Sequence, residues 1–144
     1  MAYYKLEYTV PLPGSYASFI EFSPNGRFLA VGDQHSPSLY LLDRRSGFHP
    51  TLSAITPEKP TALIWETSEA FYVGLADGRF TYYRIDLRGE KLAEGATTHS
   101  FRGVFPAFPV TAMALNADSQ TLVASVGPEV FAFRRIYGTR KFAH

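Results

Sequence analysis

Acidic pairs and histidines are the side chains of this sequence that could do chemistry. Two acidic pairs, Glu66 with Glu69 and Asp77 with Asp86, have the residue types needed for general acid–base catalysis. Glu66 and Glu69 fall in an expected turn, and Asp77 directly precedes a glycine in another, so we interpret them as solvated turn residues. There is no cysteine, and the histidines are too widely spaced to predict a zinc site. They are His35, His49, His99 and His144.

Signature motifs of common active sites are absent from the sequence. It has no glycine-rich phosphate-binding loop, no G-x-S-x-G turn and no H-E-x-x-H pair. We therefore assign no catalytic residue, no metal ligand and no cofactor, and we expect the protein not to be an enzyme.

A group of aromatic residues and an arginine in the segment 98–109 is the best candidate for binding a partner. Arg102, Phe105 and Phe108 lie in it, between prolines and glycines. Aromatic residues and arginine dominate the hot spots of protein interfaces, and long loops on a rigid scaffold carry recognition. The alternative is that these side chains cover the rim of the fold or face another subunit. The other candidate partner-binding residues are Trp65, for which the core is the alternative place, His35 and Asp77.

An internal repeat organises the chain. Residues 22–47 and 64–89 align without a gap at an offset of 42 residues, and Tyr40 then matches Tyr82. A looser third copy begins near Ala114. Repeats of this length are typical of solenoids and propellers. We divide the single domain into an outer strand at 1–13 and repeats at 14–56, 57–105 and 106–144.

Each repeat reads as short strands separated by turn residues, with no helical periodicity, so the fold class is all-β. Tight turns are expected at Ser23-Pro24-Asn25-Gly26 and at Ala76-Asp77-Gly78, because asparagine and glycine tolerate positive φ. The expected strands are 4–10, 18–22, 28–32, 38–42, 51–55, 62–65, 70–75, 79–85, one within 91–101, 110–115, 121–125 and 130–136. The side chains expected to be buried between sheets are Leu29, Val31, Leu41, Val73, Tyr83, Leu122 and Phe133.

The sequence F-S-P-N-G-R-F-L-A-V-G at 22–32, followed by S-L-Y-L-L-D at 38–43, resembles a WD-repeat β-propeller blade. Leu42 stands where the family has tryptophan, and Asp43 stands in the aspartate position. The resemblance implies radially arranged four-stranded blades, with an interaction scaffold as the function. The other repeats have Tyr83-Arg84 and Phe133-Arg134 at this place, so packing of tyrosine and phenylalanine is expected to replace the family's polar network.

Composition limits the partners. The formal net charge is +1, which predicts no general attraction to nucleic acid or membrane. The first residues have no signal-peptide pattern, so a cytoplasmic location is expected, with the nucleus possible. We expect a non-enzymatic scaffold that binds protein or peptide partners on the propeller face. The alternative is a lectin-like propeller with a sugar in pockets between blades.

Three blades are fewer than the four to eight that close a ring, so two apolar flanks are expected to be exposed. We expect two chains to close a six-bladed ring as a homodimer, with strand 4–10 of each chain pairing with strand 130–136 of the other. The interface residues of this arrangement are Tyr4, Leu6, Tyr8, Val10, Val130, Phe131, Phe133 and Ile136.

Overall fold

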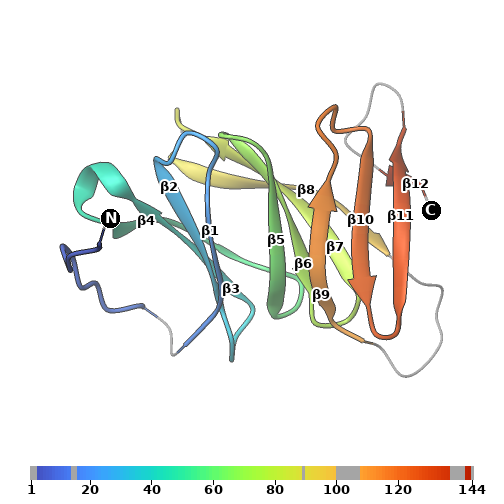
Figure 1. The fold of residues 1–144 in the computed structure, drawn as a ribbon, viewed down its shortest axis with the longest axis horizontal. Coiled ribbons are helices and arrows are strands. Elements are labelled where there is room, and N and C mark those ends of the chain that lie inside the picture. The colour runs from blue at the N-terminus through green and yellow to red at the C-terminus, as the bar shows by residue number, and fades with distance from the viewer. Residues whose placement is uncertain (1–2, 14–15, 89, 100–107, 137–141, 144) are drawn as a thin grey trace.

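The computed structural model describes residues 3–13, 16–88, 90–99, 108–136 and 142–143. Twelve strands in this part of the chain form three four-stranded antiparallel sheets, each made from one continuous stretch. Figure 1 shows them side by side as blades 1, 2 and 3. The helical content of the same residues is one 3₁₀ turn, η1 (Arg44–Ser46). The all-β expectation is confirmed.

The strand bounds follow the expected pattern closely. Blade 1 contains β1 (Ala17–Phe22), β2 (Phe28–Asp33), β3 (Ser38–Asp43) and β4 (His49–Ile55). Blade 2 contains β5 (Pro60–Thr67), β6 (Ala70–Leu75), β7 (Arg79–Asp86) and β8 (Lys91–His99). Blade 3 contains β9 (Val110–Leu115), β10 (Thr121–Val126), β11 (Glu129–Arg135) and β12 (Phe142–Ala143).

Turn chemistry explains why the strands end where they do. Gly26 has φ +72° and donates its N–H to the Ser23 carbonyl at 2.8 Å, which closes the β1–β2 turn. The buried Ser23 hydroxyl accepts the Phe28 N–H at 3.0 Å and so starts the returning strand. Gly78, at φ +88°, closes the β6–β7 turn. Both expected turns are present.

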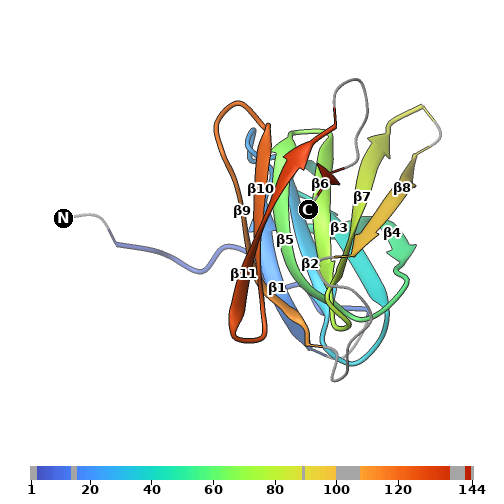
Figure 2. The same cartoon turned by 90° about the vertical axis from the view of Figure 1, so that its right-hand side faces the viewer.

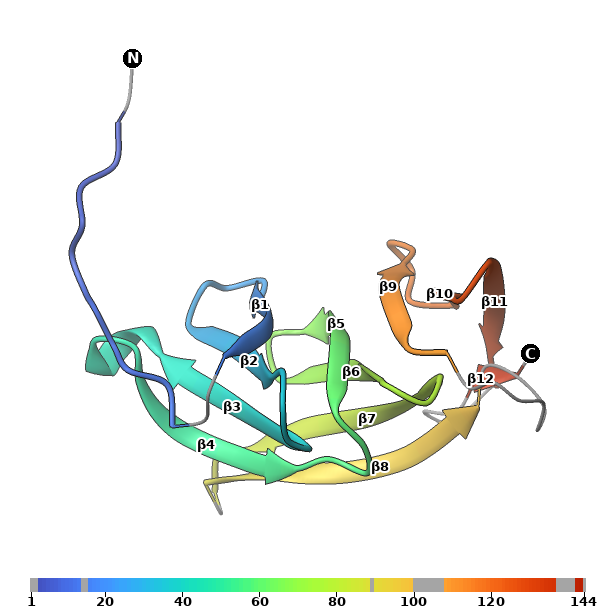
Figure 3. The ribbon, with the colours of Figure 1, turned by 90° about the horizontal axis from the view of Figure 1, so that it is seen from below.

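The core lies between the blades rather than inside any one of them. The innermost strands β1, β5 and β9 follow one another along one side of the molecule, and β4 and β8 form its outer arc (Figure 3). Because side chains alternate across a strand, blade 2 packs one face on blade 1 and the other on blade 3. Large residues between blades 1 and 2 are Phe28, Leu39, Leu41, Trp65, Phe71 and Tyr83. Between blades 2 and 3 they are Tyr72, Phe80, Tyr82, Val110, Leu122 and Phe133.

The expected core residues are buried with one exception. Val31, Leu41, Val73, Tyr83, Leu122 and Phe133 are buried. Leu29 is half-buried, because it lies on the face of blade 1 that points away from blade 2. Burial of Phe133 against Phe80, with ring centroids 5.0 Å apart, corrects its assignment to a contact with a second chain.

Strand pairing corrects the gapless alignment of the first two repeats. Val31 pairs with Tyr40, whereas its counterpart Val73 pairs with Thr81 rather than Tyr82. The connection between β2 and β3 is one residue longer than that between β6 and β7. The offset is therefore 42 residues for the second strand of each blade and 41 for the third. A one-residue shift reverses the face of every side chain, so Leu41, not Tyr40, is the structural counterpart of Tyr82.

The expected outer strand at 4–10 is also corrected. Residues 3–13 are extended but pair with no described strand, and they leave the body of the molecule beside blade 1 (Figure 3). Their described anchor is Tyr8, whose ring contacts Phe48 edge-on at 5.9 Å. Blade 3 has an outer strand of its own, because β12 pairs with β11. β12 therefore occupies the edge of β11 at Arg134 and Arg135, within the stretch 130–136 to which the strand 4–10 of a second chain was assigned.

Candidate functional site

One face of the molecule collects the turns β2–β3, β6–β7 and β10–β11 together with the starts of the innermost strands β1, β5 and β9. It is the lower edge of the view in Figure 1, and we call it the pocket face. A hollow of about 350 Å³ opens on it. The residues that line the hollow are Ala17, Ser18, Gln34, Thr61, Pro109, Val110 and Thr111.

Three hydroxyl side chains occupy the same position around this hollow. Ser18, Thr61 and Thr111 are each the second residue of an innermost strand, and the pairing register of each strand shifts at that residue. Such a β-bulge redirects a side chain out of the regular alternation. This repeated hydroxyl position could not be recognised in the sequence, because the three residues are 43 and 50 positions apart and differ in type.

The redirected hydroxyls bond one blade to the next. Ser18 Oγ donates to the Pro60 carbonyl of blade 2 at 2.8 Å. Thr61 Oγ1 of blade 2 contacts the Val110 carbonyl of blade 3 in the same way, and it also lies 3.3 Å from the Gly74 carbonyl within its own blade. Thr111 Oγ1 repeats the contact within its own blade, at 3.2 Å from the Ser125 carbonyl. Side chains of the hollow thus hold the three blades in register.

Exposed aromatic rings stand beside the hollow. Tyr16, 68% exposed, precedes β1 and contacts the His35 ring edge-on at 5.8 Å. Phe108, 41% exposed, precedes β9 and lies over Gly127, where a Cβ would come within 2.7 Å of the phenylalanine ring. His35 is itself held by its backbone N–H, which donates to the carboxylate of Asp33 at 2.8 Å.

Three of the expected partner-binding residues come together on the pocket face. His35 and Asp77 lie in its turns, and Phe108 lies at the entry to β9. Asp77 is half-buried and forms an ion pair with Arg79 at 2.6 Å. The remaining expected residues of the 98–109 segment, Arg102 and Phe105, lie outside the described residues.

Trp65 does not belong to any such surface, which corrects its inclusion among the partner-binding residues. It is 9% exposed, its ring packs on Phe71 with centroids 4.7 Å apart, and its indole N–H donates to the Glu21 carbonyl at 3.1 Å. A residue buried between blades 1 and 2 cannot contact an external partner without separating the blades.

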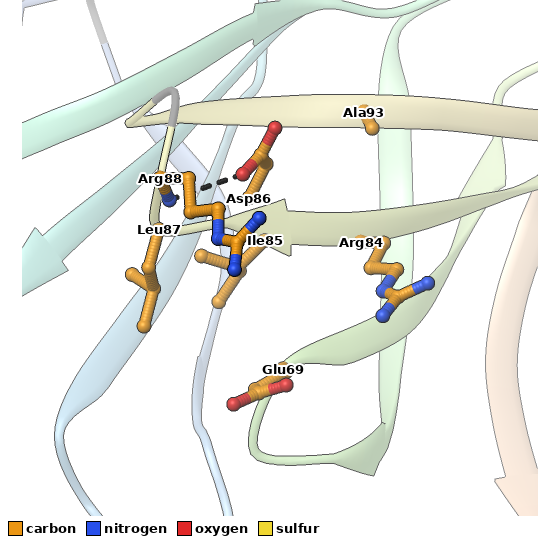
Figure 4. Close-up of a pocket in the computed structure, with 7 residues that line it drawn as sticks. All are labelled: Glu69, Arg84, Ile85, Asp86, Leu87, Arg88 and Ala93. Carbon is orange, nitrogen blue, oxygen red and sulfur yellow. Dashed lines mark hydrogen bonds between the residues drawn. The ribbon is translucent and has the colours of Figure 1, made fainter.

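The opposite face carries two hollows that meet at Leu87 in the β7–β8 turn. The first, of about 490 Å³, lies along blade 2 and contains Glu69, Arg84, Asp86 and Arg88 (Figure 4). Asp86 accepts the backbone N–H of Arg88 at 3.0 Å. The described lining of this hollow therefore presents both signs of charge and includes no aromatic side chain.

The second hollow, of about 430 Å³, lies between blade 1 and the β7–β8 turn and contains Arg27 and Asp43, which form an ion pair at 3.3 Å. By strand pairing, Glu69 and Arg84 are the counterparts of Arg27 and Asp43 in blade 2, so the charges are reversed from one blade to the next. A lectin-like propeller needs the same pocket in each blade. This pair of hollows gives that alternative no support.

A buried charged cluster joins blades 2 and 3. The carboxylate of Glu66, whose side chain is 2% exposed, forms an ion pair with Arg135, and the Tyr72 hydroxyl lies 3.3 Å from both. This corrects the interpretation of Glu66 as a solvated turn residue. Among the described residues no three or more histidine, cysteine or acidic side chains gather as a metal site, and none of the described helices is both long and apolar enough to cross a membrane.

Comparison with solved structures identifies the architecture. A chain of the mitotic checkpoint complex matches with a TM-score of 0.67 and 16% identity, over 82% of this chain and 37% of that one. The periplasmic gluconolactonase of Pseudomonas aeruginosa matches with a TM-score of 0.70 and 17% identity, over 85% of this chain and 38% of the enzyme. The fold is that of a β-propeller. No family model and no curated protein sequence matches the chain.

These comparisons correct one expectation and limit the others. A propeller with the same arrangement of blades is a gluconolactonase, so the absence of active-site motifs did not justify the expectation that the protein is not an enzyme. At 16% and 17% identity the likeness shows the fold alone. The chain spans less than two fifths of the length of either neighbour. Its described residues form three blades.

Proposed function

We propose that this chain is an interaction scaffold that binds an extended peptide segment of a protein partner on the pocket face. The observation that carries the proposal is the hollow of about 350 Å³ where the three innermost strands begin, with the exposed rings of Tyr16 and Phe108 beside it. Concave sites with a few convergent polar groups are typical binding sites. Exposed aromatic rings supply contact area at a low entropic cost.

The lining chemistry favours a neutral, hydrogen-bonding partner. The described residues that line the hollow have hydroxyl, amide and small apolar side chains, and none of them is charged. Gln34 is exposed and its backbone N–H is already bonded to the Tyr16 carbonyl at 2.7 Å, so its amide side chain can meet a peptide group. The resemblance of residues 22–43 to a WD repeat supports the same class of function.

Selection from a random peptide library displayed on phage tests this proposal. We expect peptides enriched on the full chain to lose at least tenfold in affinity when Phe108→Ser and Tyr16→Ser are combined. Leu87→Ser is the matched control, because Leu87 is a similarly exposed apolar residue on the opposite face. Failure to enrich any peptide, or equal binding by the double variant and the control, would count against the pocket face.

A glycan array separates this proposal from sugar binding. We expect no glycan to bind in an Asp43-dependent way, since the Arg27–Asp43 hollow has a charge-reversed counterpart in blade 2. Specific glycan binding that disappears in Asp43→Asn would overturn the peptide proposal in favour of a lectin.

A further inference from the structure

The two end blades each have a face that is not covered by another blade, and the two faces differ in character. On blade 1 the described segment 3–13 lies beside this face, where Tyr8 contacts Phe48 and Phe48 contacts Phe22. On blade 1 the face turned away from blade 2 carries Ile20 and Phe22, which are 60% and 53% exposed. By strand pairing these residues are the counterparts of Leu63 and Trp65 in blade 2, which are buried against blade 1. This face of blade 1 therefore has the large side chains of a blade that packs on a preceding one.

The uncovered face of blade 3 carries small side chains on β9 and β11, together with the exposed Arg134 near the end of β11. Figure 2 shows blade 3 nearest the viewer, at the end of the molecule away from blade 1. Ala112, Ala114 and Ala132 are exposed on the described strands, and Val130 is 70% exposed. A face of small residues can accept large side chains from a partner. The small residues of this face leave room for large side chains such as Ile20 and Phe22 of blade 1.

The repeated hydroxyl contact between blades also indicates that the uncovered face of blade 3 can be followed by a blade like blade 1. Ser18 bonds to the carbonyl that precedes Thr61, and Thr61 bonds to the carbonyl that precedes Thr111. The next carbonyl in this series is the one that precedes Ser18 in a following blade, which is that of Ala17. Thr111 makes the contact to Ser125 within its own blade. It lies in blade 3, and no further described blade supplies the carbonyl of the next blade.

We propose that the partner of both uncovered faces is a second copy of this chain, with blade 3 of one copy packed on blade 1 of the other. Thr111 Oγ1 then donates to the Ala17 carbonyl of the second copy, and Ile20 packs against Ala112. Two such junctions, related by a twofold axis, close a ring of six blades. The contact is made between sheet faces and does not use the edge of β11, where β12 pairs with Arg134 and Arg135. This assembly is independent of peptide binding on the pocket face, because it is argued from the uncovered faces of blades 1 and 3.

The mass of the full chain in solution, measured by sedimentation, gives the first test. We expect twice the mass of one chain, and Ile20→Glu to reduce it to that of one chain because a charge is then placed in both junctions. Ile20 is exposed in the single chain, so this variant is expected to keep its strand content in circular dichroism. A wild-type chain that remains a monomer at all concentrations would overturn the proposal.

Charge complementation tests the register of the junction. Ala112→Arg alone is also expected to be monomeric, whereas a mixture of Ile20→Glu and Ala112→Arg chains regains one intact junction and one with opposite charges. We expect the mixture to form dimers that contain one chain of each kind. Recovery of no dimer from the mixture would contradict the assigned contact.

Cross-linking reports the junction independently of stability. Because the chain has no cysteine, Thr111→Cys in one preparation and Ala17→Cys in another can be mixed and treated with a short bis-maleimide. We expect a cross-linked pair of the two chains. Leu87→Cys mixed with Thr111→Cys is the control and is expected to give none. Equal cross-linking in both mixtures would refute the head-to-tail arrangement. Peptide binding by monomeric Ile20→Glu would show that docking and assembly fail separately.

Discussion

The indole N–H of Trp65 donates to the backbone carbonyl of Glu21 at 3.1 Å, across the boundary between blades 2 and 1. The bond uses the polar end of a side chain whose ring is otherwise packed on Phe71. It joins two neighbouring innermost strands whose ladders are separate. Trp65 therefore stabilises the contact between blades 1 and 2 through both its ring and its hydrogen bond.

Replacing Trp65 with phenylalanine is expected to destabilise the chain by about 1–3 kcal/mol, because the variant loses the hydrogen bond and leaves a cavity. Urea denaturation followed by far-UV circular dichroism measures this change without the tryptophan signal. Leu87→Ala, at an exposed position, is the control and should change stability by less than about 0.5 kcal/mol. Equal stability of Trp65→Phe and the wild type would show that the contact contributes nothing.

Removing one partner of the Glu66–Arg135 pair is expected to cost about 3–5 kcal/mol, since the other charge is then left in a buried setting. Glu66→Leu combined with Arg135→Met should be far less damaging than Glu66→Leu alone. A double-mutant cycle built on unfolding free energies checks this. Additive effects of the two substitutions would contradict a coupled pair.

Adding a methyl group at Gly74 is expected to destabilise the contact between blades 2 and 3 by about 1–3 kcal/mol. A Cβ there would lie 2.5 Å from Val110 Cγ1 and 2.6 Å from Val110 Cβ. Ser125→Ala is the matched control, because Ser125 occupies the same position in blade 3 on the uncovered face. Thermal unfolding of the two variants should separate them, and a neutral Gly74→Ala would mean that the blades can move apart at no cost.

Tyr83 is expected to make the stability of the chain depend on alkaline pH. Burial raises the pKa of its hydroxyl far above the ordinary value of 10.0, and the charge of Glu94, its partner on β8, adds to the effect. The folded state therefore keeps a proton that the unfolded state loses. The contribution of protonated Tyr83 to the free energy of unfolding is complete below pH 10.0. It falls as the pH rises further, by up to about 1.4 kcal/mol per pH unit.

Urea denaturation of wild type and Tyr83→Phe at a series of pH values tests this dependence. The difference in unfolding free energy between the two proteins should stay constant from about pH 7 to about pH 9 and change in favour of the variant above about pH 10. A difference that is independent of pH throughout would mean that Tyr83 ionises equally in both states.

The strands were predictable from the sequence because turn residues and alternating apolar residues are local signals. Gly26 and Gly78 mark hairpins that the structure contains. The pairing of Tyr40 with Tyr82 failed because one extra residue in a turn shifts all later residues of the repeat. The two-residue strand β12 offers no pattern to recognise.

The contacts at the candidate site were less accessible to sequence reasoning. The structure brings His35, Asp77 and Phe108 to one face, because the β2–β3 turn, the β6–β7 turn and the start of β9 lie at the same end of the molecule. The bulges at Ser18, Thr61 and Thr111 depend on the pairing register of each strand, which cannot be predicted from any single residue. Glu66 and Arg135 are 69 positions apart, so only the packing of blade 3 on blade 2 brings the charges together.

Because each sheet is built from one continuous stretch of chain, the order of translation matches the order of the blades in space. A nascent chain can complete blade 1 before β5 leaves the ribosome, and blade 2 can then close onto a surface that already exists. Each new hairpin pairs with the strand synthesised just before it, which keeps the entropic cost of loop closure low. Folding during synthesis can therefore proceed from blade 1 to blade 2 and then to blade 3, each blade closing onto the one before it.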